Sequence, residues 1–279
     1  MGPGTAASLA IGGVRTVILS RTAESAERGL GMARDQLAYL HREDAAALLS
    51  ASAQLDDVAA QVDLIIESAP ENMTLKQQIF ARLDAIAKAD CILATNTSGL
   101  SITAIQSACT RPERAITTHF WNPPHLMPLV EIVNGAQTGP GIAETLRDLF
   151  LRCGKVPVIV RKDRPGQLGN RLQSALIREA LYIVQEGIAS VEDVDLAVMN
   201  GFGRRLPVYG VFEHLDAVGL DTACAVADYV SRDLSNHQGL MPILAEKRDR
   251  RETFYNWSTR SMVEVKARLY RFLSELPKG

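Results

Sequence analysis

Short apolar runs rich in β-branched residues recur along the first part of the chain, each bounded by turn residues. Runs of this length and composition predict buried strands, and the longer stretches between them have the spacing of amphipathic helices. Alternating strands and helices pack as a mainly parallel, doubly wound sheet covered by helices on both faces. The predicted strands are Thr16–Leu19, Val62–Glu67, Cys91–Thr95, Ala115–His119, Leu129–Val133 and Val156–Val160.

The pattern changes after the last of these runs. The breaker cluster Asp163-Arg164-Pro165-Gly166 is followed by helical periodicity to the end of the chain, so we predict an α/β domain over residues 1–163 and an all-helical domain over 164–279. Within the first domain, Ala23 to Ser50 predicts one or two long helices. In the second, a helix from Asn170 to Glu186 carries a broad apolar face suited to burial or to dimer contact. The last predicted helix is Met262–Leu276.

Composition narrows the function classes. A chain of 279 residues suits two cores, and 47% hydrophobic with 22% charged residues is typical of a globular protein. The net charge of −2 and the lack of a basic run argue against nucleic acid as a partner. The 4 cysteines show no CxxC spacing, which argues against a metal site or a disulfide framework. With no membrane-length apolar run and no signal pattern, we expect a cytoplasmic protein without a membrane partner.

Polar side chains lie at or just beyond the ends of three neighbouring predicted strands. They are Ser98, His119, Asn122 and Glu131, and open α/β sheets bind their ligands at such strand ends. His119 and Glu131 are separated by a proline-stiffened loop, which allows the carboxylate to meet the imidazole. A carboxylate at that position fixes the tautomer of the imidazole and raises its basicity. The pattern therefore predicts a general base that works near neutral pH.

The segments TNTSGLSI, THFWNPP and PLVEIV, in this order, resemble the NAD-dependent L-3-hydroxyacyl-CoA dehydrogenase family, which also includes dehydrogenases of small hydroxy acids without CoA. The resemblance extends over nearly the whole chain. It implies a Rossmann-like domain, a helical C-terminal domain that forms a homodimer, and an active site in the cleft between the domains. It also implies NAD as the cofactor and a role in fatty acid metabolism.

The resemblance assigns roles to individual residues. His119 is expected to take the proton of the substrate's 3-hydroxyl while the hydride leaves for the nicotinamide, and Glu131 to orient His119. Ser98 and Asn170 are expected to hydrogen-bond the reacting oxygen, and Asn122 to position the nicotinamide or His119. The residues expected to bind the cofactor are Gly2, Ser20, Arg21, Ala69, Glu71, Lys76, Asn96, Ser98 and Asn122.

At three sites in the chain, the sequence allows two interpretations. Ser20 and Arg21 stand where the family has an acidic residue for the adenosine ribose, so they suit the 2′-phosphate of NADP, unless Arg21 is only a solvated loop residue. The spacing around Lys76 predicts a surface charge, whereas the resemblance predicts a cleft residue. Arg204 and Arg205 depart from an apolar family loop and either meet a substrate carboxylate or CoA phosphate or form an exposed basic loop.

The beginning of the chain also departs from the family pattern. The segment MGPGTAASLAIGG predicts a phosphate-binding turn running into a helix, in which Gly2 matches the last glycine of the G-x-G-x-x-G fingerprint. The central strand of the sheet and the first two glycines are missing, so the strands ending at Leu19 and Glu67 should face an empty slot. We expect about ten further residues upstream in the functional protein, and a poorly stable protein with weak dinucleotide binding without them.

These observations favour an oxidoreductase that transfers hydride between a nicotinamide and the 3-hydroxyl of a 3-hydroxyacyl-CoA. The first alternative retains the chemistry but uses a free hydroxy acid, such as a sugar acid or a carnitine-like compound. The second alternative is a non-enzymatic relic of the fold with a disabled nucleotide site. In the two enzymatic interpretations the substrate is a small molecule, an acyl-CoA or a hydroxy acid, and no nucleic acid, membrane or metal is expected.

Overall fold

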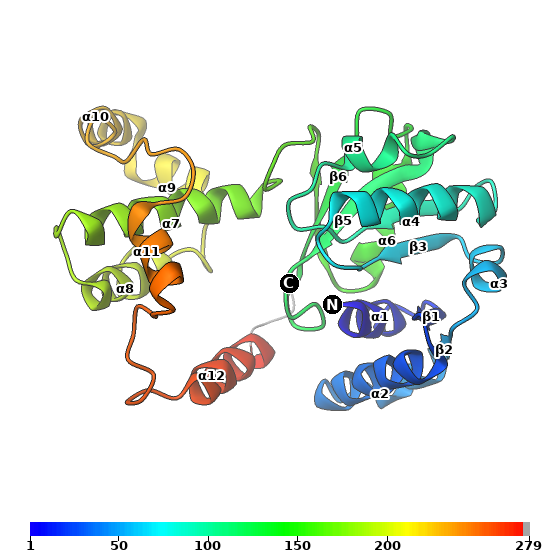
Figure 1. Ribbon diagram of the computed structural model, residues 1–279. Coiled ribbons are helices and arrows are strands. Elements are labelled where there is room, and N and C mark those ends of the chain that lie inside the picture. The colour runs from blue at the N-terminus through cyan, green and yellow to red at the C-terminus, as the bar shows by residue number, and fades with distance from the viewer. Residues whose placement is uncertain (276–279) are drawn as a thin grey trace. The chain divides into compact units, whose positions relative to one another are not determined.

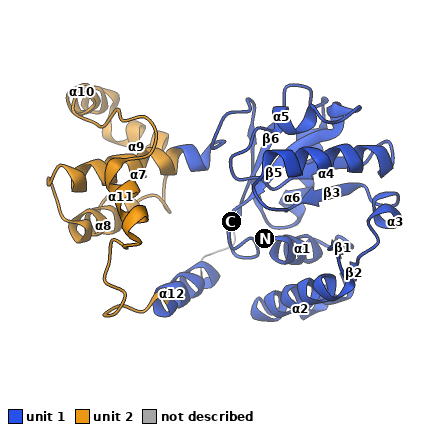
Figure 2. Ribbon diagram, viewed as in Figure 1, with its two compact units in different colours: residues 1–171, 263–279 blue, residues 172–262 orange. Residues whose placement is uncertain are grey.

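The computed structural model describes residues 1–275, which form two compact units (Figure 2). One unit comprises residues 1–171 together with the C-terminal segment that begins at Val263, and the other comprises residues 172–262. Along the chain, the boundary between residues 171 and 172 falls within helix α7, Gly169–Gln185. The expected domain boundary after residue 163 stays a prediction.

A five-stranded sheet forms the centre of the first unit (Figure 1). Its order is β3-β4-β5-β6-β7, and all neighbours are parallel except β5 and β6. The loop between β5 and β6 is too short for a parallel crossover, which takes about a dozen residues or more, so the two strands pair antiparallel. The sheet is therefore parallel, as expected, except at this pair. The strands are β3 Leu64–Glu67, β4 Ile92–Thr95, β5 Ala115–Phe120, β6 Leu129–Asn134 and β7 Val156–Val160.

A separate two-stranded parallel sheet joins β1, Thr16–Leu19, to β2, Leu49–Ser52. The stretch predicted to be helical, Ala23 to Ser50, holds the helix α2, Ala23–Tyr39, and a 3-10 turn, Glu43–Leu48, and its last two residues begin the strand β2. Alanine-rich sequence favours helix locally, but pairing with β1 overrides that preference. As expected for the strands ending at Leu19 and Glu67, β1 and β3 belong to different sheets, and no described strand pairs with the free edge of either.

Helix α1, Gly2–Ile11, links the two sheets because opposite faces of it are buried against different partners. Leu9 packs into the cluster of Phe120 and Phe150 beside the larger sheet. The alanines Ala6, Ala7 and Ala10 pack against α2 and the smaller sheet. The other helices of this unit are α3 Leu55–Ala59, α4 Met73–Ile86, α5 Ile102–Gln106 and α6 Ile142–Arg152, with a 3-10 turn at Pro112–Arg114.

The second unit is helical, but its side chains are hardly buried. Within residues 172–262 only Ser235 and Met241 fall in the buried class. Its helices after α7 are α8 Val191–Asn200, a 3-10 turn Phe202–Arg204, α9 Val211–Val218, α10 Leu220–Val230 and α11 Pro242–Arg250. Helix α12 is Met262–Glu275, and the predicted helix end at Leu276 lies outside the described residues. Over residues 1–275, no helix is long and apolar enough to cross a membrane.

Candidate active site

His119 and Glu131 face each other across the antiparallel pair β5 and β6, where the register makes them direct partners. Nδ1 of His119 lies 2.7 Å from Oε2 of Glu131. Both side chains are buried, Glu131 completely and His119 with 5% of its surface exposed. The pair that the spacing predicted is therefore present, and Nε2 of the imidazole is the nitrogen left for a substrate.

The carboxylate of Glu131 accepts four N–H donors. Oε2 accepts from His119 and, at 3.0 Å, from Nε1 of Trp121. Oε1 accepts from the backbone N–H groups of Leu168 and Gly169 at 2.9 and 2.8 Å. Burial by itself raises the pKa of Glu131, but the hydrogen bonds from His119, Gly169, Trp121 and Leu168 outweigh it and hold the pKa at about 2. An ionised Glu131 requires that Nδ1 of His119 carry a proton, which assigns the tautomer.

The loop after β4 brings the next predicted residues together. Asn96 is buried, and its Oδ1 accepts the backbone N–H of Phe120 at 2.8 Å, next to His119. Ser98 is exposed, and its carbonyl accepts a hydrogen bond of 2.8 Å from the side chain of Asn170. Ser98 and Asn170 are thus in contact at the start of α7, close in sequence to Gly169, which bonds Glu131. Asn122 is exposed just beyond β5.

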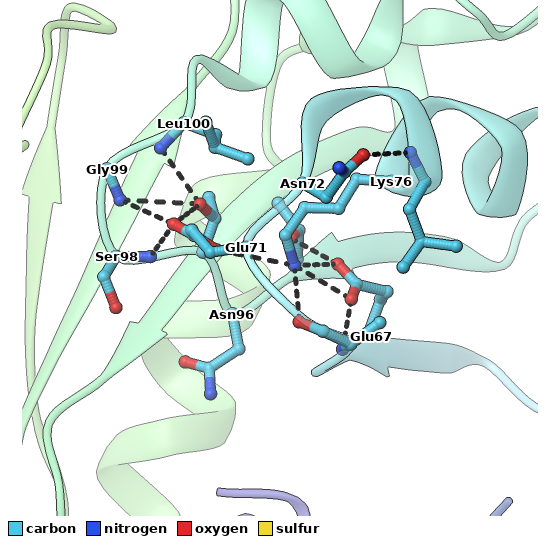
Figure 3. A network of polar contacts seen from close by, with 12 residues as sticks. Glu67, Glu71, Asn72, Lys76, Asn96, Ser98, Gly99 and Leu100 are labelled. Atoms are coloured by element: carbon cyan, nitrogen blue, oxygen red, sulfur yellow. Dashed lines mark hydrogen bonds and ion pairs between the residues drawn. The ribbon is translucent and has the colours of Figure 1, made fainter.

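The carboxylate of Glu71 accepts hydrogen bonds from the loop that contains Ser98 (Figure 3). Its Oε1 accepts the backbone N–H groups of Ser98 and Gly99 at 2.9 and 3.1 Å and the hydroxyl of Thr97. Partial burial acts to raise the pKa of Glu71, but the Thr97 hydroxyl, the Lys76 ammonium and the two N–H groups lower it below its usual value. Glu71 therefore remains ionised and fixes the backbone conformation of the loop.

Lys76 lies behind Glu71 and is completely buried, so the interpretation of Lys76 as a surface charge is wrong. Its Nζ donates to both carboxylate oxygens of Glu67 at 2.9 Å and to the carbonyl of Ala69 at 3.1 Å, and lies 3.7 Å from Oε2 of Glu71 (Figure 3). The apolar part of the Lys76 side chain is buried, and its ammonium group contacts hydrogen-bond acceptors, the carboxylate and carbonyl oxygens named above. Its contact with the cofactor stays a prediction. Glu67, which sequence reasoning did not single out, is its main partner.

The residues predicted for the adenosine end lie around α1 and β1. The N-terminus of α1 has no side-chain cap and no acidic residue in its first turn, so its free N–H groups fit a phosphate. Gly2 opens this helix, and no atom lies within 4 Å of the position that a Cβ would take there. Ser20 follows β1 and donates its backbone N–H to Ser52, while Arg21 is exposed. These features fit a dinucleotide.

Two residues next to the His–Glu pair were missed in the sequence. Gln167 is buried and donates to the carbonyl of Thr97 at 2.9 Å, which adds a second link between the start of α7 and the Ser98 loop. Trp121 bonds Glu131, and its ring lies 5.9 Å from that of His119 between centroids. In the sequence, Trp121 could have been noticed only because a tryptophan that becomes partly buried needs a hydrogen-bond partner for its indole N–H.

The remaining predicted features take no part in these contacts. Arg204 and Arg205 are both exposed, at and just after the 3-10 turn of the second unit. The 4 cysteines are unpaired. Within residues 1–275 no group of three or more His, Cys, Asp or Glu side chains is arranged to hold a metal ion.

A doubly wound sheet with a buried His–Glu pair beside a strand end is the arrangement expected of a nucleotide-binding enzyme that uses a general base. Residues 1–164 match the family described as 3-hydroxyacyl-CoA dehydrogenase, NAD binding domain, and residues 166–254 match 3-hydroxyacyl-CoA dehydrogenase, C-terminal domain. The chain therefore belongs to the 3-hydroxyacyl-CoA dehydrogenase family, a family of NAD-dependent enzymes, which confirms the family, the cofactor NAD and the Rossmann-like fold with a helical C-terminal domain.

Individual relatives differ in how much of their length they share. The 5-formyl-3-hydroxy-2-methylpyridine 4-carboxylate 5-dehydrogenase of Mesorhizobium japonicum is 36% identical over 88% of this chain and 82% of its own. A solved structure of a dehydrogenase of that name, described as an NAD+ dependent dismutase, has a TM-score of 0.90 at 33% identity, over 98% of this chain and 93% of its own.

Two further relatives match less of the fold or of their own length. L-carnitine dehydrogenase of Pseudomonas putida is 39% identical over 57% of this chain, which spans only half of that enzyme. The structure of (S)-3-hydroxybutyryl-CoA dehydrogenase from Ralstonia eutropha has a TM-score of 0.67 at 32% identity, over 82% of each chain.

Proposed function

We propose that the protein uses NAD to oxidise a small substrate that carries a free carboxylate and no CoA, with His119 as the general base. The observation that carries the chemistry is the 2.7 Å hydrogen bond between Nδ1 of His119 and the ionised, four-fold hydrogen-bonded Glu131. A base held in one tautomer by a buried carboxylate accepts a proton at Nε2 and is stabilised when it becomes charged.

The residues around His119 have matching tasks in this proposal. Ser98 and Asn170, in contact through the Ser98 carbonyl, hydrogen-bond the reacting oxygen. Glu71 keeps the Ser98 loop in shape, and Asn96 holds the backbone of Phe120 beside the base. Bound NAD would accept the hydride, with the N-terminus of α1 and Gly2 at its phosphates and Ala69 and Asn122 near its other end. NADP binding through Ser20 and Arg21 stays a prediction.

The comparisons favour a free acid over a CoA thioester. The relative that matches over most of its length is named for a pyridine carboxylate, and its structure has a higher TM-score than the hydroxybutyryl-CoA enzyme. A 3-hydroxyacyl-CoA remains the second candidate, because the family match and 32% identity to that enzyme support it. Membership of an enzyme family also supports an enzyme over a non-enzymatic relic.

A substrate panel with NAD and NADP tests the proposal. We expect turnover of hydroxy or formyl carboxylic acids and none of 3-hydroxybutyryl-CoA. In Arg204→Ala/Arg205→Ala, the KM of the preferred acid should rise about tenfold, because each guanidinium offers charge-assisted hydrogen bonds to a carboxylate. An uncharged ester of the same acid should keep its kcat and KM in that variant. Turnover of the CoA thioester alone would contradict the free-acid proposal, and an unchanged KM would leave the arginines as an exposed basic loop.

We also propose that residues 172–262 form a homodimer interface. With only two buried residues, this helical unit does not form a hydrophobic core of its own. Large apolar side chains are exposed on several of its helices. On α9 and α10, for example, Phe212 and Tyr229 are each 81% exposed. A second copy of the chain is the occupant we propose, since self-complementary contacts of this kind are the commonest in soluble proteins.

The mass in solution tests the dimer. We expect twice the chain mass by light scattering, and a shift towards the monomer in Phe212→Asp, because a carboxylate in an apolar interface loses its hydration. Met32→Asp is the matched control, since Met32 is 54% exposed on α2 of the other unit and should leave the mass unchanged. A monomeric wild-type protein would refute the interface.

A further inference from the structure

The indole N–H of Trp121 donates to the last free lone-pair site of the Glu131 carboxylate. An ionised carboxylate has about four lone-pair sites, and Glu131 receives four N–H groups. Two of these are backbone groups at the start of α7, and one is the imidazole of His119. The fourth, Nε1 of Trp121, shares Oε2 with His119, so the indole and the imidazole bond the same oxygen at once.

Close packing keeps the indole in this place. A methyl group added at Gly169 would lie 2.5 Å from Cζ2 of Trp121, so the ring rests directly on the backbone at the start of α7. That same backbone N–H bonds Oε1 of Glu131, and the next residue is Asn170, whose side chain bonds the Ser98 carbonyl. The ring thus packs on the residue that bonds Glu131 and lies next to the one whose side chain bonds the Ser98 loop.

We infer that Trp121 is a positioning residue for the His119–Glu131 pair: its N–H fixes Oε2 and limits how strongly the carboxylate polarises the imidazole. The inference rests on the proposed role of His119 as the base. Glu131 is the titratable group that contacts His119 from β6, while the groups that reach Glu131 from the start of α7 are uncharged backbone N–H donors. Removal of the indole N–H therefore acts on His119 through Glu131.

The test uses Trp121→Phe, which removes the N–H but keeps an aromatic ring against Gly169. With one donor fewer, Glu131 becomes the more basic acceptor and stabilises the imidazolium more strongly, so the acid limb of the kcat/KM profile should move up by roughly half a pH unit. Looser orientation should lower kcat roughly 3–10-fold, with the KM of NAD unchanged. If Trp121→Phe instead raises KM and lowers thermal stability while the pH profile stays in place, the inference is overturned and Trp121 has only a packing role.

A second measurement needs no substrate. The chain has 2 tryptophans, and the other, Trp257, lies in the second unit beside Tyr255. Trp257→Phe should keep wild-type activity and make Trp121 the only tryptophan. Because an imidazolium quenches indole emission more than a neutral imidazole does, that emission should fall with decreasing pH, at the midpoint of the acid limb.

Adding His119→Gln to Trp257→Phe should abolish the fluorescence titration. A titration that persists without His119, or no titration in Trp257→Phe alone, would overturn the inference. If no substrate is ever turned over, the fluorescence titration still reports the contact, so failure of the proposed function and failure of this inference are distinguishable.

Discussion

Replacing His119 by Gln is expected to lower kcat by about 10²–10⁴-fold, the usual contribution of a general base, with KM little changed. The Gln amide can still donate to Oε2 of Glu131, which now accepts from Nδ1 of His119, so the fold should survive the substitution. Steady-state kinetics on the acid identified by the panel measures the effect. Thermal unfolding of the same preparation separates lost chemistry from lost structure.

The double variant with Glu131→Gln tests whether the two residues act as a unit. Glu131→Gln alone should also lower kcat, and it places an amide N–H₂ against N–H donors of Trp121, Leu168 or Gly169, with a cost of about 1–3 kcal/mol for each donor left unsatisfied. Because the base is already absent in His119→Gln, adding Glu131→Gln should reduce kcat far less than it does in the wild type. Multiplicative losses would refute the pairing.

Replacing Lys76 by Met is expected to destabilise the protein by about 3–5 kcal/mol, because it leaves the carboxylate of Glu67 buried without its cation. The side chains of Lys76 and Glu67 are 1% and 4% exposed, so water cannot take over the lost contacts. Urea denaturation measures the change in the free energy of unfolding. The loss is a large part of a typical total of about 5–15 kcal/mol.

Two variants control this prediction. Lys88→Met removes a lysine whose partner Asp63 is 90% exposed, and should leave the free energy of unfolding nearly unchanged, because water screens an exposed ion pair. Adding Glu67→Gln to Lys76→Met should recover part of the stability, since the uncompensated charge is then gone. The one remaining side-chain oxygen can still accept the N–H of Ala69, and the hydroxyl of Thr95 can turn to accept from the new amide. A double variant that loses the sum of both single effects would contradict the buried ion pair as the cause.

The sequence by itself determined the local features of the first unit. The strand Val156–Val160 is predicted with the bounds that the structure has, because a β-branched run between turn residues has no competing local conformation. The pairing of His119 with Glu131 was also predictable. A short proline-rich loop between two strands confines their ends to a small volume, and two complementary side chains there meet.

Only the tertiary structure decided where the remaining polar groups go. Spacing indicated a surface position for Lys76, but the carboxylate of Glu67 comes from another element and makes burial of the ammonium favourable. In the same way β2 forms because β1 lies beside it, despite helix-forming sequence. The indole of Trp121 bonds Glu131 because the end of β5 and the start of α7 both reach that carboxylate on β6. Hydrogen-bond partners far apart in the chain leave no periodicity in the sequence, so no local pattern identifies them.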